Sequence, residues 1–311
     1  DLKTEETFVS TASPVEVLPG IRNNFKKGLL MISVVANPVR RNFLDVFVIS
    51  KRTLLSDPFL VFRVGVDQTS KQKVIPVNEV TQVANMWVGD LVLNDKVKGR
   101  LELSVTGITQ TTKVGLTDTL MLQIENASVR SAFFMSSQQV TLSLPEGGVS
   151  KPSIIAIIPE RVPPRRNKIA TNSKDLKQAS ETYLVYAPTA EVKKKGEIQF
   201  NYPSGVRIQT GQIGVYWWEE ASDQWKYTGS KQAVDKISGS FPAFGRYGLF
   251  EDDIAPVLGE LNIFPEERVL TISVEEMGSG VDPRLVVLTM NNQQVSATFK
   301  SEEGKVVWRP G

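Results

Sequence analysis

Short runs of alternating apolar and polar residues cover most of the chain, and turn-forming residues separate them at close spacing. Side chains of a β-strand point alternately to opposite faces, so a period of two predicts strands. No segment of helical length repeats its apolar residues every three or four positions. The pattern predicts an all-β protein, with strands at 29–35, 43–50, 59–66, 84–93, 99–108, 119–126, 131–135, 139–144, 153–158, 182–187, 260–264, 268–275, 285–290, 294–300 and 305–308.

Residues 197–250 form the most aromatic stretch, with four of the six tyrosines and three of the five tryptophans. Alternation places Trp217 on one face of a strand and Tyr216 and Trp218 on the other. After the polar loop 219–224, Trp225 resumes the alternation, which is typical of a β-hairpin.

Two uses of these aromatic residues stay open. In the first, Trp217 and Trp225 belong to the core, while Tyr216 and Trp218 cover a second surface such as a neighbouring module. In the second, Tyr216 and Trp218 form an exposed platform that binds a sugar ring or a peptide.

The spacing of strands and turns divides the chain into modules. Six or seven short strands over about a hundred residues are typical of an immunoglobulin-like sandwich. The last module has only five strand signals, so we expect it to be incomplete, with an adhesive open strand edge unless another chain or module covers it. The expected parts are a linker at 1–14, an immunoglobulin-like β-sandwich at 15–129, a second at 130–253 and a partial one at 254–311.

Composition narrows the possible functions. The 311 residues include no cysteine and no histidine, which excludes cysteine nucleophiles, histidine general bases and metal sites built on either residue. The formal net charge is only +2, so no global field draws the chain to nucleic acid. No apolar run is long enough for a membrane span. The residues from Asp1 do not read as a signal peptide, so we expect a mature form or an excised piece of a longer protein. Missing cysteine fits an exported protein, whether periplasmic, cell-surface or extracellular.

Several motifs resemble those of a known group of modules. They are residues 140–148 (VTLSLPEGG), 213–218 (IGVYWW) with 225–227 (WKY), 244–250 (FGRYGLF) and the turn 277–282 (MGSGVD). Together they resemble the ZU5-like and immunoglobulin-like modules of large exported bacterial proteins. The resemblance covers roughly residues 130–311 and implies a β-sandwich beside a protease or adhesive domain. Some ZU5 proteins cut themselves at a His-Phe-Ser step, but the matching residues 239–244 (GSFPAF) lack the histidine, so self-cleavage is not expected.

Carboxylates at the expected junction of the last two modules are candidate metal ligands. Glu251, Asp252 and Asp253 are consecutive, and Asp282 lies in a turn of the next module. Oxygen ligands of this kind suit Ca²⁺, which would stiffen the junction. The alternatives are a hydrated, charged linker and a glycosidase-type carboxylate pair.

The sequence therefore predicts no catalytic residue and no obligatory cofactor. We expect a non-enzymatic structural or interaction segment that spaces or presents other domains of a larger exported bacterial protein. Its partners would be those domains or another surface protein. The alternatives are a carbohydrate- or peptide-binding module and an accessory region of a secreted protease or other hydrolase.

Overall fold

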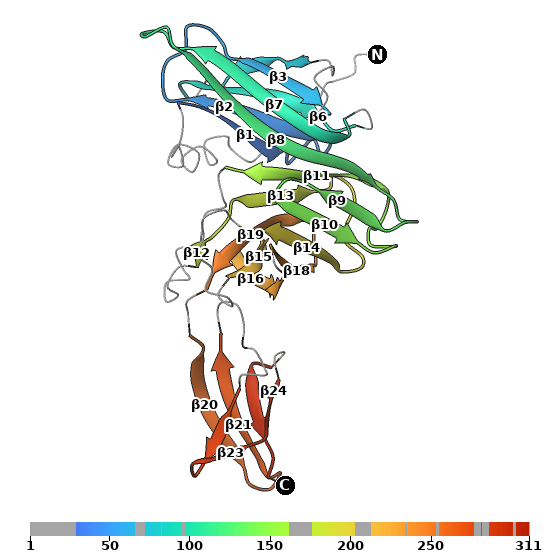
Figure 1. Cartoon of the computed structure of the whole chain (residues 1–311), viewed down its shortest axis with the longest axis vertical. Helices are drawn as coiled ribbons and strands as arrows, with labels where there is room; N and C mark the ends of the chain where they lie inside the picture. The colour runs from blue at the N-terminus through green and yellow to red at the C-terminus, as the bar shows by residue number, and fades with distance from the viewer. Residues whose placement is uncertain are drawn as a thin grey trace, which may run out of the picture.

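The computed structural model describes residues 29–65, 72–81, 83–94, 97–161, 176–202, 213–233, 235–252, 255–276, 281, 286–300 and 303–310. Every regular element in these ranges is a β-strand, which confirms the predicted all-β fold. No helix that could cross a membrane occurs in the described part of the chain. The expected linker at 1–14 lies outside the described residues. Three sets of strands follow one another along the long axis of the molecule (Figure 1).

The first set forms a sandwich of two antiparallel layers. One layer is a sheet in the order β1-β2-β6-β5, and the other is one end of a larger sheet, in the order β8-β7-β3-β4. Apolar side chains of both layers meet in one buried cluster. The strands are β1 (Leu30–Ala36), β2 (Phe43–Ser50), β3 (Phe59–Val64), β4 (Lys73–Ile75), β5 (Val77–Glu79), β6 (Met86–Val92), β7 (Gly99–Ile108) and β8 (Gly115–Ala127).

The second set forms another sandwich. One layer is a sheet in the order β17-β18-β14-β10-β9, and the other continues the larger sheet through β11, β13, β19, β15 and β16, with β12 beside β19. The strands are β9 (Phe133–Ser136), β10 (Val140–Leu144), β11 (Ser153–Glu160), β12 (Lys177–Gln178), β13 (Thr182–Tyr186), β14 (Gly196–Asn201), β15 (Ile213–Glu219), β16 (Gln224–Gly229), β17 (Lys231–Gln232), β18 (Lys236–Phe241) and β19 (Gly245–Glu251).

One ten-stranded sheet runs through both sandwiches, because β8 pairs with β7 on one side and with β11 on the other. The sheet gives opposite faces to the two cores. Ala156, Ile158 and Leu184 belong to the first core, whereas Ile157 and Val185, on the same two strands, belong to the second. Strands β11 and β13 are therefore buried on both faces, which explains why residues 154–158 (IIAII) are apolar without alternation.

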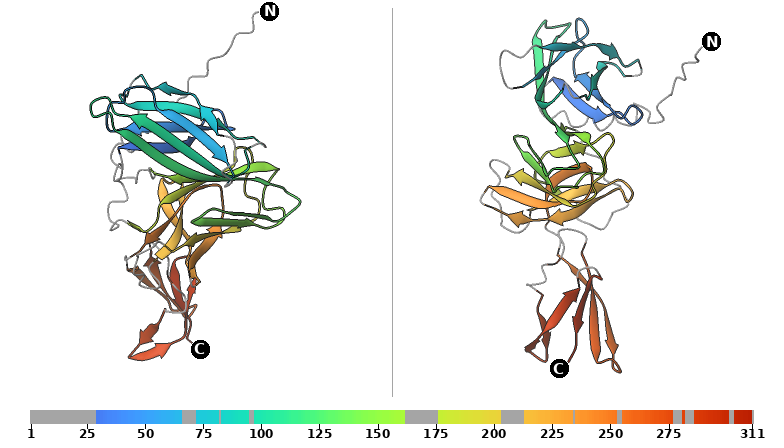
Figure 2. Two further views of the ribbon diagram at one scale, coloured as in Figure 1. Left: turned by 45° about the horizontal axis from the view of Figure 1, so that its top comes forward. Right: turned by 90° about the vertical axis from the view of Figure 1, so that its right-hand side faces the viewer.

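The shared sheet changes the expected picture of separate modules. The boundary expected near residue 130 lies between β8 and β9, but the hydrogen-bond ladder continues from β8 to β11. Tyr186 adds a contact across the two sandwiches, since its hydroxyl donates to the backbone oxygen of Arg41 at 2.6 Å. Figure 2 shows the two sandwiches joined by this common layer.

The third set has its own strand pairing in the described residues. Strands β20-β21-β25-β24 form one sheet, and β22 and β23 form a separate hairpin. Among the described residues of this region, only Val269, Val306 and Val307 are buried apolar side chains. The strands are β20 (Val257–Phe264), β21 (Val269–Glu275), β22 (Leu288–Met290), β23 (Gln293–Val295), β24 (Ala297–Lys300) and β25 (Lys305–Trp308).

The four-stranded sheet of the third region carries one apolar face. Its pairing register sets Leu258 opposite Val274, Leu261 opposite Ile272 and Ile263 opposite Leu270, and directly opposed residues share a face. The three β20 side chains are 70%, 56% and 64% exposed, so this half of the face is largely uncovered. The partial last module expected at 254–311 stays a prediction from the sequence.

Candidate functional site

The expected aromatic platform at Tyr216 and Trp218 is wrong as to exposure, because these side chains are only 0% and 3% exposed. Their covering comes from the hairpin itself. The register opposes Tyr216 to Tyr227 and Trp218 to Trp225, so all four lie on one face of the sheet. Trp217 packs on the second core, but Trp225 lies on the opposite face, contrary to the expected core role for both.

These rings form an aromatic cluster with Phe250 of β19. Trp218 meets Trp225 edge to face with ring centroids 5.4 Å apart, and Tyr216 meets Phe250 in the same way at 5.5 Å. Edge-to-face contacts of this kind stabilise packed aromatic groups. Tyr216 and Trp218 therefore contribute to packing, and the structure does not present them to a ligand.

The hydroxyl of Tyr216 is buried and has no hydrogen-bond partner among the described residues. Burial raises the pKa of Tyr216 well above its ordinary value, and the charge of Asp252 raises it further. The hydroxyl therefore stays protonated at physiological pH and is no candidate base. This position contrasts with Tyr247, whose hydroxyl donates to the backbone oxygen of Ala243 at 2.5 Å.

The structure describes two of the four expected calcium ligands, Glu251 and Asp252. Glu251 is ion-paired with Lys177, with Nζ and Oε2 2.6 Å apart, and Asp252 is buried. Asp253 and Asp282 lie outside the described residues. No group of three or more carboxylates suited to a metal ion occurs in the described part of the chain. The calcium site therefore stays a prediction that rests on the sequence alone.

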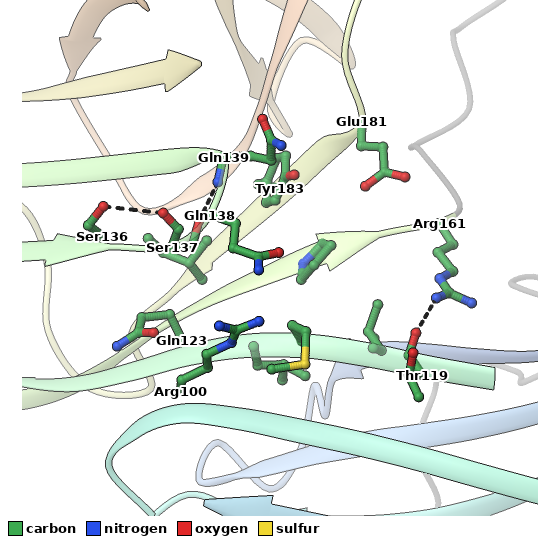
Figure 3. A pocket seen from close by; sticks show the side chains of 15 residues that line it. Arg100, Thr119, Gln123, Ser136, Ser137, Gln138, Gln139, Arg161, Glu181 and Tyr183 are labelled. Carbon is green, nitrogen blue, oxygen red and sulfur yellow. Dashed lines mark hydrogen bonds between the residues drawn. The ribbon is translucent and has the colours of Figure 1, made fainter. Parts of the chain in front are cut away.

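A cleft of about 450 Å³ lies where the first and second sandwiches meet. One face of the shared sheet covers the second core at β11 and β13. The same face continues onto β8 and β7, where it is the outer surface of the first sandwich, and the cleft lies where this change occurs. The floor comes from β8, β11 and β13, and one wall is the β9–β10 turn (Figure 3). Its lining residues are Arg100, residues 119–123, Ser136, Ser137, Gln138, Gln139, Ile157, Pro159, Arg161, Glu181 and Tyr183.

Arg161 closes one end of the cleft and is held firmly. Its guanidinium is ion-paired with Asp118 and donates to the backbone oxygen of Thr119 at 2.6 Å. The same Asp118 carboxylate accepts a hydrogen bond from the backbone N–H of Ile32 at 2.7 Å. Asp118 thus joins β1, β8 and the end of β11, and it neutralises Arg161.

Arg100 lies on β7, next to the β8 part of the floor, and its guanidinium has no ion-pair partner among the described residues. It stands directly opposite Gln123 of β8, and Figure 3 shows its guanidinium directed into the cleft, towards Gln138. Neighbouring carboxylates have other partners. Glu125 accepts from the Gln123 amide at 3.3 Å and lies 3.6 Å from Lys98, and Glu102 accepts from the Ser104 hydroxyl at 3.1 Å.

Two further groups define the polarity of the cleft. Burial raises the pKa of Tyr183 far above its ordinary value, and the nearby Glu181 charge acts in the same direction. The Tyr183 hydroxyl therefore acts only in its neutral form. Among its described lining residues the cleft carries Arg100, which forms no ion pair there, an exposed carboxylate at Glu181 and several amides and hydroxyls between them. Such groups can hydrogen-bond a polar ligand, and they include no activated nucleophile.

Sequence reasoning missed this cleft, because its walls come from five strands and a turn that are distant along the chain. The local signal was the polar turn Ser136-Ser137-Gln138-Gln139 between two short strands, which reads as an ordinary loop. The predicted strand 99–108 includes Arg100, but alternation of polar and apolar residues does not show which polar side chain lies in a cleft.

Comparison of the chain with protein-family models, with curated proteins and with solved structures finds no match. The resemblance to ZU5-like and immunoglobulin-like modules therefore remains an expectation from short motifs.

Proposed function

We propose that this chain is a non-enzymatic structural and interaction segment of a larger exported protein, which spaces and presents other domains. The observation that carries the proposal is the two-sided burial of β11 and β13. A strand shared by two cores cannot tilt in one sandwich without disturbing the other, because packed interiors resist deformation. The two sandwiches should therefore move as one stiff unit.

The interaction role belongs to the third region. Its apolar face consists of Leu258, Leu261 and Ile263 with their cross-strand partners on β21. These side chains are neighbours, so they form a contiguous surface. Contiguous exposed apolar surface marks a place where another protein surface packs. We assign it to a neighbouring domain of the parent polypeptide or to another surface protein, as the interaction part of the proposal.

Export is part of the same proposal and rests on two sequence features. The chain lacks cysteine, and its motifs resemble modules of exported bacterial proteins. A cell-surface or periplasmic location fits a segment that spaces domains.

The stiffness is tested by spin labelling, which the absence of native cysteine makes simple. One label pair, at Thr111→Cys and Lys231→Cys, joins exposed positions of the first and second sandwiches. A second pair, at Lys231→Cys and Gln293→Cys, joins the second sandwich to the third region. Double electron–electron resonance should give a narrow distance distribution for the first pair. A first distribution as broad as that of an unstructured linker, or a compact particle by small-angle scattering, would count against the proposal.

A further inference from the structure

The cleft between the two sandwiches has a feature that a purely structural segment does not need. Arg100 is half-buried in it, and no carboxylate in the described residues neutralises its charge. A half-buried guanidinium has lost part of its hydration without gaining an anion. It therefore gains more from an incoming anionic group than a fully hydrated surface arginine would.

The arrangement around Arg100 is fixed by the sheet. Gln123 is its direct cross-strand neighbour, and Glu125 and Met121 are the diagonal ones. Glu125 contacts Lys98 and Gln123, and no ion pair joins it to Arg100 in the described residues. The guanidinium of Arg100 points towards Gln138 in the cleft (Figure 3).

A carboxylate matches this group, because its two oxygens accept two parallel hydrogen bonds from a guanidinium. The rest of the lining suits the polar body of such a ligand. Gln138 and Gln139 offer amide donors and acceptors, and Ser137 offers a hydroxyl, although this hydroxyl donates to the backbone oxygen of Val140 at 3.0 Å. The volume of about 450 Å³ lies within the range of small-ligand sites.

We infer that the cleft binds a small carboxylate-bearing polar ligand, with Arg100 holding the carboxylate. The two nearest sources of that group are a uronic acid sugar and the C-terminal carboxylate of a short peptide. This inference goes beyond the proposed function. A stiff segment would exist without any ligand, and the spin-label distances test that role separately.

The experiment uses two matched pairs of probes on the full chain. One pair is glucuronate and glucose, and the other is acetyl-glycylglycine and its C-terminal amide. Saturation-transfer NMR with a concentration series gives the dissociation constants, expected on the order of 1 mM for the acid that fits. The acid should bind at least about tenfold more tightly than its neutral partner, a difference of about 1.4 kcal/mol. Binding by glucuronate alone identifies a sugar acid, and binding by the peptide acid alone identifies a peptide carboxylate.

Arg100→Gln removes the charge and should weaken binding of the acid at least about tenfold, to the level of the neutral probe. Its thermal midpoint should be unchanged, because the Arg100 guanidinium makes no bond to another described residue. Arg52→Gln, which removes an exposed arginine from the β2–β3 loop, should bind as the wild type does. The inference fails if neither acid binds, if an acid and its neutral partner bind equally, or if Arg100→Gln binds as well as the wild type.

Discussion

Ile157 and Ile158 are adjacent in β11, yet they belong to the cores of two different sandwiches. Both side chains are essentially inaccessible to solvent, at 1% and 0% exposure. Successive side chains of a strand point to opposite faces, so a strand with two cores needs apolar residues at every position. This one strand thereby couples the stability of the two sandwiches.

The first prediction concerns that coupling. Ile158→Ala should lower the free energy of unfolding by about 2–5 kcal/mol, because it leaves a cavity in a closed core. Hydrogen exchange should also accelerate in β14, which lies in the other sandwich, since β11 loosens on both faces. Ile157→Ala should give the reciprocal result, with faster exchange in β2. Chemical denaturation followed by hydrogen-exchange mass spectrometry measures both effects.

A matched control comes from Ile108, which is 48% exposed at the end of β7 in the same sheet. Ile108→Ala should cost less than about 1 kcal/mol. If Ile158→Ala speeds exchange in the first sandwich and leaves β14 untouched, the two sandwiches are energetically independent and the coupling idea is wrong.

The second prediction concerns Asp118, which binds the backbone N–H of Ile32 and the guanidinium of Arg161. Asp118→Asn should destabilise the chain by about 1–3 kcal/mol, because it leaves a partly buried cation without its anion. Asp90 pairs with Arg40 on the surface, where both side chains are more than 40% exposed. Asp90→Asn should therefore cost at most about 1 kcal/mol. Thermal or urea unfolding compares the two variants, and equal losses would contradict the assigned role of Asp118.

The all-β class could be predicted from alternation and turn spacing because both are local properties of the chain. The shared sheet could not, since pairing of β8 with β11 depends on which edges meet in space. The apolar run within 153–158 indicates a buried strand, but it does not tell that two separate cores bury its two faces. Short edge strands such as β4 and β12 were missed for a similar reason, because neighbouring strands define them.

The candidate site was harder to foresee than the fold. Alternation separated Tyr216 and Trp218 from Trp217 correctly, but it gave no information on what covers each face. The β15–β16 hairpin pairs Glu219 with Gln224 next to its turn, and this register sets Trp225 opposite Trp218. The number of residues that a turn of this kind leaves unpaired has no clear mark in the sequence.

The third prediction compares two buried tyrosines. The Tyr216 hydroxyl has no hydrogen-bond partner in the part of the chain that the structure describes, so Tyr216→Phe should leave stability unchanged or raise it by about 1 kcal/mol. Tyr247 donates to Ala243, so Tyr247→Phe should lower stability by about 1 kcal/mol. Urea midpoints give the comparison. A clear loss of stability in Tyr216→Phe would mean that its hydroxyl has a partner, and that outcome would reject the assignment.

The fourth prediction concerns the apolar face of the third region. Ile263 is 64% exposed on this face, and its strand β20 is an edge of the sheet formed by the described residues, where a further strand can pair. We expect the isolated chain to associate as its concentration rises, and Ile263→Lys to reduce that association. Asn262→Lys adds the same charge to the opposite face and should have a smaller effect. Light scattering over a concentration series decides, and a wild type that stays monomeric throughout would contradict the prediction.

The last prediction concerns Glu160, whose side chain is buried at the end of β11. One of its oxygens accepts a hydrogen bond from the Arg246 Nε at 2.9 Å, and the other has no partner within the described ranges. Burial raises the pKa of Glu160 above its ordinary value, and this effect exceeds the opposite influence of Arg246. The folded protein therefore holds this proton more tightly than the unfolded chain does.

The sign of the pH dependence follows from that difference. The stability contributed by protonated Glu160 is fully present below the unfolded pKa, near 4.5, and it is lost as pH rises through the raised folded pKa. Urea unfolding measured from acidic to neutral pH should show this loss in the wild type. Glu160→Gln cannot ionise at this position. The free energy of unfolding of the wild type, measured relative to this variant, should therefore decrease as pH rises. Arg246→Gln removes the opposing cation and should make the loss steeper, because nothing then favours the charged form of Glu160. A difference between wild type and Glu160→Gln that grows in favour of the wild type as pH rises would show that the Arg246 pairing outweighs burial.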